Sequence, residues 1–263
     1  MLTATASYGI ISRDMTSSLQ RTANQPAVER ATENFQNSLS SIKTIDDFMS
    51  NDKVYRYALK AYGLEDMAYA KAFIRKVVSE GVSDSKSFAN SLTDSRYKAL
   101  AAAFTFDSDG NATFDASSLG QQVVGTYLRQ TMEEKAGDEN EGARLALYFQ
   151  RKAEAGEITS AYSILADPAL LQVARTAVGL DASTGSIDID KQAKMYAERI
   201  DIPDLSDPDK LDKFIKKFLV MYDMENSSAG SDNPALQLIT GNSASTGFDS
   251  GLLLTLQTLR SKG

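Results

Sequence analysis

The stretch VYRYALKAYGLED, residues 54–66, has the apolar spacing and the closing glycine of an amphipathic helix. Val54 and Tyr57 stand three residues apart, which places them on one face of a helix, and Gly63 suits the left-handed position that ends many helices. A similar stretch, LLQVARTAVGLDA, follows at residues 170–182. The chain therefore carries the same helical pattern twice.

The similarity extends beyond these two helices. When Gly63 is aligned with Gly179, an offset of 116 residues (from 63 to 179), apolar positions agree along both stretches. Downstream, TDSRYKALAAAF at 93–104 resembles DPDKLDKFIKKF at 207–218 in its pattern. This period exceeds the roughly 20 to 50 residues of solenoid repeats. The pattern therefore predicts the duplication of a whole helical subdomain.

Most of the chain shows helical periodicity bounded by capping residues, and alternating strand patterns are scarce, so we expect an all-α fold. Apolar stripes, closing glycines and Asp-Pro starts divide the chain into segments. The expected segments are a flexible N-terminal segment at 1–26, a first helical unit with a bridging helix at 27–137, a second helical unit at 138–224, and a linker with a C-terminal helix at 225–263.

The composition excludes several classes of protein. The 263 residues contain no cysteine and no histidine, so disulfides, thiolate nucleophiles and imidazole bases are all missing, and no cofactor is expected. The formal net charge is -7, and Lys and Arg are spread along the chain, which argues against a nucleic-acid partner. No apolar run is long enough to predict a membrane span, and the polar start indicates no Sec signal peptide.

The C-terminal segment combines a Ser/Gly/Asn-rich linker with an apolar helix pattern, FDSGLLLTLQTLRSKG. Asp249 or Ser250 can cap its first turn. Two interpretations remain open: the helix folds back onto its own chain, or it docks onto a neighbouring subunit or a partner. The candidate partner-binding residues are Leu252, Leu253, Leu256 and Leu259.

One stretch, DSDGNATFD at 107–115, resembles the start of an EF-hand calcium loop. Asp107, Asp109 and Asn111 match its first three oxygen ligands. The sixth and twelfth positions, Ala112 and Ser118, lack the glycine and the bidentate glutamate that the loop requires. A plain turn is therefore the preferred interpretation, with these three residues as weak metal candidates.

Other motifs predict no catalytic site. GQQVVGT at 120–126 lacks the lysine of a phosphate loop, and GFDSG at 247–251 lacks any histidine to activate its serine. The acidic clusters suit helix capping better than glycosidase chemistry. These clusters are Asp46-Asp47, Glu133-Glu134, and Asp201, Asp204, Asp207 and Asp209.

Several segments together resemble an uncharacterised family of alphaproteobacterial proteins. They include SFANSLTDSRYKALAAAFTF, YLRQTMEEKAGDENEGARLALYFQRKA and ITSAYSILADPALLQVARTAVGL. The resemblance spans the two predicted helical units and includes no catalytic motif. It implies a flagellum-associated protein, because members of this family are often encoded within or beside flagellar gene clusters.

We therefore expect a non-enzymatic flagellum-associated structural or assembly protein that acts through protein-protein contacts. Two alternatives stay open: a cytoplasmic helix-binding regulatory or chaperone-like module, and a carboxylate-only metal-dependent enzyme centred on Asp107 and Asp109. The protein is either cytoplasmic or exported through the flagellar secretion apparatus. Composition does not separate these two locations, and it leaves the oligomeric state and the specific partner open.

Overall fold

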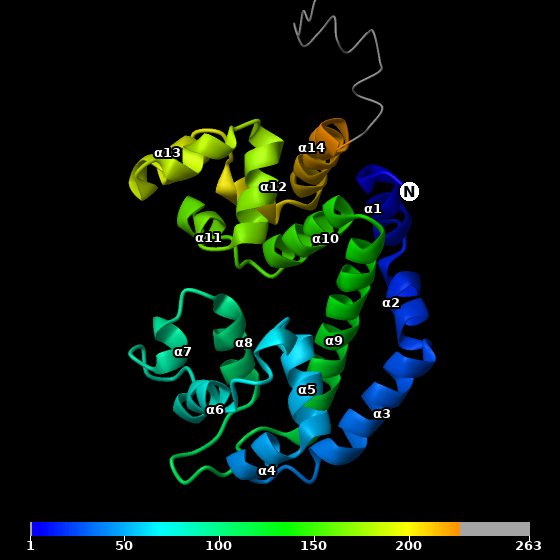
Figure 1. Ribbon diagram of the computed structural model, residues 1–263, viewed down its shortest axis with the longest axis vertical. Coiled ribbons are helices and arrows are strands. Elements are labelled where there is room, and N and C mark those ends of the chain that lie inside the picture. The colour runs from blue at the N-terminus through cyan, green and yellow to red at the C-terminus, as the bar shows by residue number, and fades with distance from the viewer. Residues whose placement is uncertain (1, 227–263) are drawn as a thin grey trace, which may run out of the picture. The chain divides into compact units, whose positions relative to one another are not determined.

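The computed structural model describes residues 2–226, and these residues form fourteen α-helices and three short 3-10 helices (Figure 1). In chain order they are α1 (Ala4–Ser12), α2 (Met15–Ala23), α3 (Pro26–Leu39), α4 (Ile45–Ser50), α5 (Asp52–Ala61), η1 (Glu65–Met67), α6 (Lys71–Glu80), α7 (Phe88–Ser91), α8 (Ser95–Ala103), α9 (Ala116–Glu139), α10 (Glu141–Glu154), α11 (Ala161–Leu165), α12 (Pro168–Val178), η2 (Ala182–Ser186), α13 (Ile189–Ala197), η3 (Ile202–Ser206) and α14 (Pro208–Asn226).

The expected all-α class is confirmed. Within residues 2–226 no strand forms, and β pairing is limited to two isolated bridges, Thr44 with Asn111 and Phe106 with Ala112. None of the helices in this range combines the length and the apolar character that a membrane crossing requires.

The order of helices repeats along the chain. The series α3, α4, α5, η1, α6, α7, α8 is followed, after α9, by α10, α11, α12, η2, α13, η3, α14. In both series the first helix packs on the third, and the second packs on the third and on the next α-helix. We call these two series the first and the second repeat.

Local capping explains why the two repeats start and stop their helices at matching places. Thr44 before α4 and Ser160 before α11 both form capping boxes, in which side chain and backbone satisfy each other's free N–H groups. Gly63 and Gly179 have φ angles of 68° and 66°, a left-handed conformation that costs glycine little. The same offset of 116 residues (from 44 to 160, and from 63 to 179) separates both pairs.

The buried apolar side chains form two clusters. The first cluster lies between Val28 and Tyr127 along the chain, and includes stacked Phe35, Tyr57 and Tyr127 rings. The second contains residues from Met132 to Leu219 together with Ala4 and Tyr8 of α1. Helix α9 contributes to both, because its first half packs on α3 and α5 and the helix also packs on α10. By contacts between Cα atoms, residues 1–223 form one compact unit.

The expectation of a flexible segment at 1–26 is wrong for residues 4–23, which form α1 and α2. Small, polar residues suggested flexibility, but here they permit close helix packing. Ala4 and Ser7 of α1 are buried where this helix packs on α10. In α2, the Ser18 and Thr22 hydroxyls are satisfied by backbone carbonyls one turn earlier.

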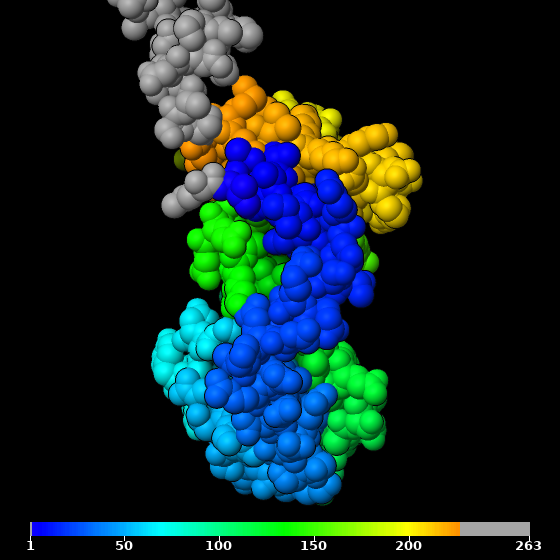
Figure 2. All heavy atoms as spheres, turned by 90° about the vertical axis from the view of Figure 1, so that its right-hand side faces the viewer, coloured from blue at the N-terminus to red at the C-terminus, as the bar shows by residue number. Residues whose placement is uncertain are grey.

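The start of α1 is held by the far end of the described chain. The Asp223 carboxylate accepts hydrogen bonds from the backbone N–H groups of Ala4 (2.7 Å) and Thr5 (3.0 Å), and from the Thr5 hydroxyl (2.6 Å). A carboxylate at a helix N-terminus satisfies free donors and interacts favourably with the helix dipole. Figure 2 shows α1, in dark blue, against α14, in orange.

We expect Asp223→Ala to release the start of α1. Loss of a capping carboxylate costs about 1 kcal/mol, and the effect should be concentrated in amide hydrogen exchange of residues 4–12. Asp212→Ala is the control, because Asp212 is on the same helix and pairs with Lys216 (2.7 Å). Equal exchange of residues 4–12 in the two variants would contradict this role of Asp223.

Candidate functional site: the cleft beside α9

A cleft of about 1070 Å³ lies beside α9 in the described part of the chain. Its walls come from the end of α5, the start of α8, the middle of α9, residues along α10, and the start of α12. Large clefts with converging polar groups are the default candidates for binding or catalysis. The charged side chains that line it are Asp94, Arg96, Arg129, Glu133, Glu134, Arg144, Arg151, Lys152, Glu157 and Asp167.

Glu133 is the most deeply buried of these charges, with 3 % of its side chain exposed. Arg151 of α10 binds it with two parallel hydrogen bonds, from Nε to Oε1 (2.7 Å) and from Nη2 to Oε2 (2.8 Å). Arg129, one turn earlier on α9, adds a bond from its Nε (3.0 Å). Burial opposes the charge on Arg151, but the bonds to Glu133 keep the pKa of Arg151 above its usual value. The cluster joins α9 to α10.

A second group of contacts lies on the second repeat's side of the cleft. The Tyr148 hydroxyl donates to Asp167 Oδ2 (2.6 Å). Burial, together with this carboxylate, raises the pKa of Tyr148, so its phenol stays protonated. Lys152 is almost fully buried, where it pairs with Glu157 and lies 3.4 Å from the Ser95 hydroxyl of the first repeat. Lys152 therefore links the two repeats across the cleft.

On the first repeat's side, the loop around Gly63 approaches α9 closely. A Cβ atom at Gly63 would lie 3.4 Å from Nε2 of Gln130, and the positive φ at this position already favours glycine. Arg96 donates to the Gly63 carbonyl and forms an ion pair with Asp94 (2.7 Å). The repeated glycine at the end of α5 therefore also fixes the edge of the cleft.

Every charged side chain that lines the cleft has a partner within the described chain. Arg144 pairs with Glu141, Glu134 pairs with Lys60 (3.1 Å), and the remaining pairs are given above. Paired carboxylates and guanidinium groups hold helices in fixed positions but do not offer a free general base. The arrangement braces α9 against both repeats.

The weak metal candidates lie elsewhere, in the loop between α8 and α9. Asp107 Oδ1 accepts from the backbone N–H groups of Asp109 (3.0 Å) and Asn111 (2.7 Å), and Oδ2 accepts from the Asn111 side-chain amide (3.1 Å). These bonds lower the pKa of Asp107, with the Asn111 backbone as the largest cause. Ile45 donates to the Gly110 carbonyl (2.9 Å), which ties the loop to α4. The Asp107 carboxylate thus organises a turn.

We expect addition of Ca²⁺ or Mg²⁺ to leave the melting temperature unchanged, because the Asp107 oxygens already accept bonds from their own loop. Asp107→Ala should lower the melting temperature with and without the ion by the same amount. A rise in the melting temperature with Ca²⁺ that Asp107→Ala removes would instead support the carboxylate enzyme. Among residues 2–226, no group of three or more acidic side chains is placed to hold a metal.

The other predicted features either lie within helices and helix caps or lie outside the described residues. GQQVVGT at 120–126 lies within α9. Asp47 completes the capping box of α4, and Asp207 accepts from the backbone N–H of Asp209 (3.0 Å) at the start of α14. GFDSG and the four candidate leucines, Leu252, Leu253, Leu256 and Leu259, lie outside the described residues.

The sequence assigned Glu133 and Glu134 to helix capping, which is wrong, because both lie within α9 and pair with basic side chains in the cleft. The sequence did not predict the cleft itself. The Arg129–Glu133 spacing of four residues is a local signal for an ion pair on one helix face. The contact of Arg151 with Glu133 spans 18 residues and depends on the angle between α9 and α10. Only the packed structure brings these side chains together.

A smaller cavity of about 510 Å³ lies between α1 and α14, and we call it the α1/α14 groove. Its apolar wall comes from residues spaced by four along α14, and its other wall comes from one face of α1. Gly9 lines the α1 side, where a Cβ atom would meet nothing within 4 Å. The apolar wall consists of Leu211, Ile215 and Leu219.

Comparison with known proteins shows the family. Residues 61–211 match the family described as "Protein of unknown function (DUF1217)". Among solved structures, the X-ray crystal structure of protein AGR_C_984 from Agrobacterium tumefaciens is similar, with 47% sequence identity and a TM-score of 0.75. The similarity covers 85% of this chain and 94% of that chain. No curated protein matches. The chain therefore belongs to the DUF1217 family, whose function is unknown.

Proposed function

We propose that this protein is a non-enzymatic structural or assembly component of the bacterial flagellum that works through protein-protein contacts. The observation that carries the non-enzymatic part is the internal pairing of the charges that line the cleft beside α9. Such pairing suits a braced scaffold. The flagellar part rests on the resemblance to proteins encoded beside flagellar genes.

The contact surface in this proposal is the apolar C-terminal segment. Its leucines, Leu252, Leu253, Leu256 and Leu259, recur at helical spacing. They lie outside the described residues, so the proposal for them rests on the sequence pattern. An amphipathic helix with such a stripe is a common means of binding a partner groove.

Deletion of the gene tests the flagellar role. We expect the deletion strain to lose swimming in soft agar and to show abnormal filaments, and the full-length gene to restore both. A gene truncated after Gly247 should fail to restore swimming although the purified truncated protein keeps its melting temperature. Normal swimming and normal filaments in the deletion strain would reject the flagellar role.

The α1/α14 groove favours a second candidate function, a cytoplasmic helix-binding regulatory or chaperone-like module. Leu211, Ile215 and Leu219 line one side of the groove but are almost fully buried, and a Cβ atom at Gly9 on the other side would meet nothing within 4 Å. Grooves of this kind bind the apolar face of a helix.

Two experiments separate the candidates. Gly9→Arg places a long charged side chain in the groove without a clash, so client binding should fall while the melting temperature holds. Gly185→Arg is the control, because a Cβ atom there also meets nothing within 4 Å and Gly185 does not line the groove. A tagged copy found outside the cell, and only when the flagellar export apparatus is intact, would exclude a purely cytoplasmic module.

A further inference from the structure

Three of the large apolar side chains that remain exposed lie around α11 and α13 in the second repeat. Ile189 is 56 % exposed, Tyr162 is 51 % exposed and Ile187 is 38 % exposed. Tyr162 is on α11, and the two isoleucines lie at the start of α13, which packs on α11 (Figure 1). We call these three residues the α11/α13 patch. Exposed apolar side chains that lie together mark a contact surface more often than single exposed apolar side chains do.

The patch is held in a defined conformation. The Tyr162 hydroxyl donates to Asp190 Oδ1 (2.7 Å), which fixes the exposed ring beside α13. Gln192 donates to the Ile187 carbonyl (2.6 Å). Asp188 caps α13 by accepting from the backbone N–H of Asp190 (3.1 Å). A surface ordered in advance loses less entropy when it binds.

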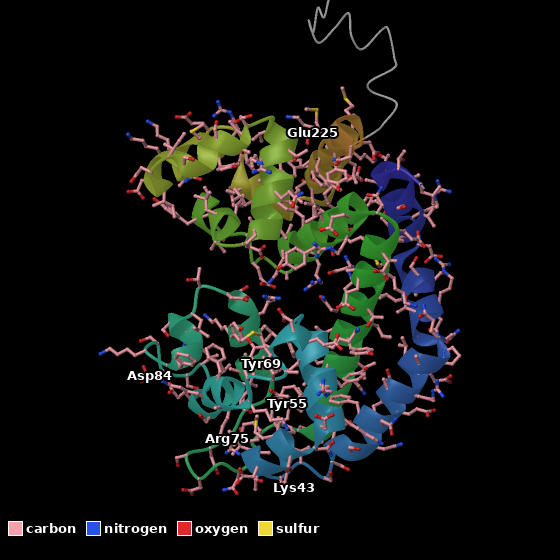
Figure 3. All side chains as sticks on the ribbon, in the orientation of Figure 1. Lys43, Tyr55, Tyr69, Arg75, Asp84 and Glu225 are labelled. Carbon is pink, nitrogen blue, oxygen red and sulfur yellow. The ribbon has the colours of Figure 1, made fainter. Side chains whose placement is uncertain are left out.

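The first repeat shows that helix packing alone does not require this patch. Its equivalent helices, α4 and α6, are joined by an exposed ion pair between Asp46 and Arg75 (Figure 3). Asp46 stands 116 residues before Tyr162 (from 46 to 162), the offset of the repeats. At this position the first repeat has a charged pair, whereas the second repeat has an exposed aromatic side chain whose hydroxyl also makes a polar contact, with Asp190.

Two carboxylates, those of Asp188 and Asp190, lie at the start of α13 beside the patch. Neither Asp188 nor Asp190 forms an ion pair with another described residue. Asp190 accepts from the Tyr162 hydroxyl, and Asp188 accepts from backbone N–H groups in the first turn of α13. The hydrogen bond to Asp190, followed by burial and the charges of both aspartates, raises the pKa of Tyr162. Lys191 and Lys194 also lie on α13, but the charges that shift this phenol are the two carboxylates.

We propose that the α11/α13 patch binds a basic amphipathic segment of a partner protein, with an apolar side chain against Ile189 and Tyr162 and a lysine or arginine beside Asp190. This inference rests on the proposed action through protein contacts and names one surface and the partner's chemistry. A cation on the partner would form an ion pair with the Asp190 carboxylate, which has only the Tyr162 hydroxyl and no cation beside it among the described residues, and the partner's apolar side chain would cover the exposed side chains.

The test uses the full chain and a synthetic helical peptide of about four turns, with leucines on one face and lysines flanking them. Binding is measured by fluorescence anisotropy, and the control peptide replaces each lysine with glutamate. We expect the basic peptide to bind more tightly than the acidic one, and added salt to weaken that binding. Equal affinity for the two peptides would overturn the proposal.

Variants locate the binding surface. Ile189→Ser should weaken basic-peptide binding about tenfold, the effect of a contact hot spot. Asp190→Asn removes the charge but keeps an oxygen that can accept from Tyr162, so it should weaken binding and reduce the dependence on salt. Tyr69→Ser in the first repeat is the control, because Tyr69 is 82 % exposed between η1 and α6, far along the chain from the patch (Figure 3).

The outcomes for this surface and for the flagellar role are separate. Unchanged peptide binding by Ile189→Ser would overturn the proposed basic partner. A dimer of the wild type that Ile189→Ser abolishes in analytical ultracentrifugation would also overturn it, because a second copy would then cover the patch. Normal swimming of the deletion strain would reject the flagellar role and leave the peptide result standing. Loss of swimming with no preference for the basic peptide would support the flagellar role and overturn the proposed basic partner.

Discussion

Replacing Glu133 with alanine is expected to lower the free energy of unfolding by about 3 kcal/mol. The substitution leaves the Arg151 guanidinium without its carboxylate partner, and burial penalises an unpaired charge. Arg129 loses the same partner. The exposed fractions of the two arginine side chains, 27 % and 14 %, leave little water to compensate. Urea unfolding followed by circular dichroism measures the change in midpoint.

The neighbouring residue supplies the control for this prediction. Glu134 is 37 % exposed and pairs with Lys60 (3.1 Å), so Glu134→Ala should cost less than about 1 kcal/mol. A triple variant, Arg129→Met, Glu133→Leu and Arg151→Met, should recover much of the lost stability, because it removes all three charges of this cluster together. If Glu133→Ala and Glu134→Ala cost the same, Glu133 does not have the bracing role described here.

Gly142→Ala is expected to lower the free energy of unfolding by about 2 kcal/mol, the cost of forcing atoms into a packed site. A Cβ atom at Gly142 would lie 2.4 Å from a ring carbon of Tyr222 and 2.7 Å from the Cβ of Ala4. Both distances are well inside van der Waals contact. The added methyl group therefore pushes the start of α1 and the end of α14 away from α10.

The sign of this effect distinguishes packing from helix propensity. Alanine favours a helix over glycine by up to about 1 kcal/mol, so propensity alone would make the variant more stable. Gly125→Ala is the matched control, because Gly125 lies within α9 and its Cβ would meet nothing within 4 Å. We expect Gly125→Ala to stabilise the protein by about 0.5 kcal/mol. Thermal unfolding, with hydrogen exchange in residues 4–12, measures both variants.

Local signals in the sequence accounted for most helix boundaries. Asp94, Asp115 and Asp188 are the N-caps of α8, α9 and α13, as their positions before apolar runs predict. Gly63 and Gly156 adopt the positive φ expected after a helix. Capping and glycine termination act within a few residues, so one chain segment contains all the information that they need.

The helical periodicity of the stretch from Asp66 to Ser79 predicts a single helix there, and this stretch shows where local signals fail. The structure divides this stretch into η1 and α6, with Ala68, Tyr69 and Ala70 between them. The Tyr55 hydroxyl donates to the Ala68 carbonyl (3.2 Å), and the Lys71 ammonium donates to the Met49 carbonyl (3.1 Å). These contacts with α4 and α5 favour a bend over a continuous helix.

The sequence by itself determined the all-α class, the repeated order of helices around Gly63 and Gly179, and the turn at Asp107, because each depends on neighbours in the chain. The tertiary structure decided the roles of α1, the cleft and the α11/α13 patch. Asp223 meets Ala4 across 219 residues, and Arg151 meets Glu133 only because α10 packs on α9. Such contacts depend on how the helices pack, which helical periodicity does not specify.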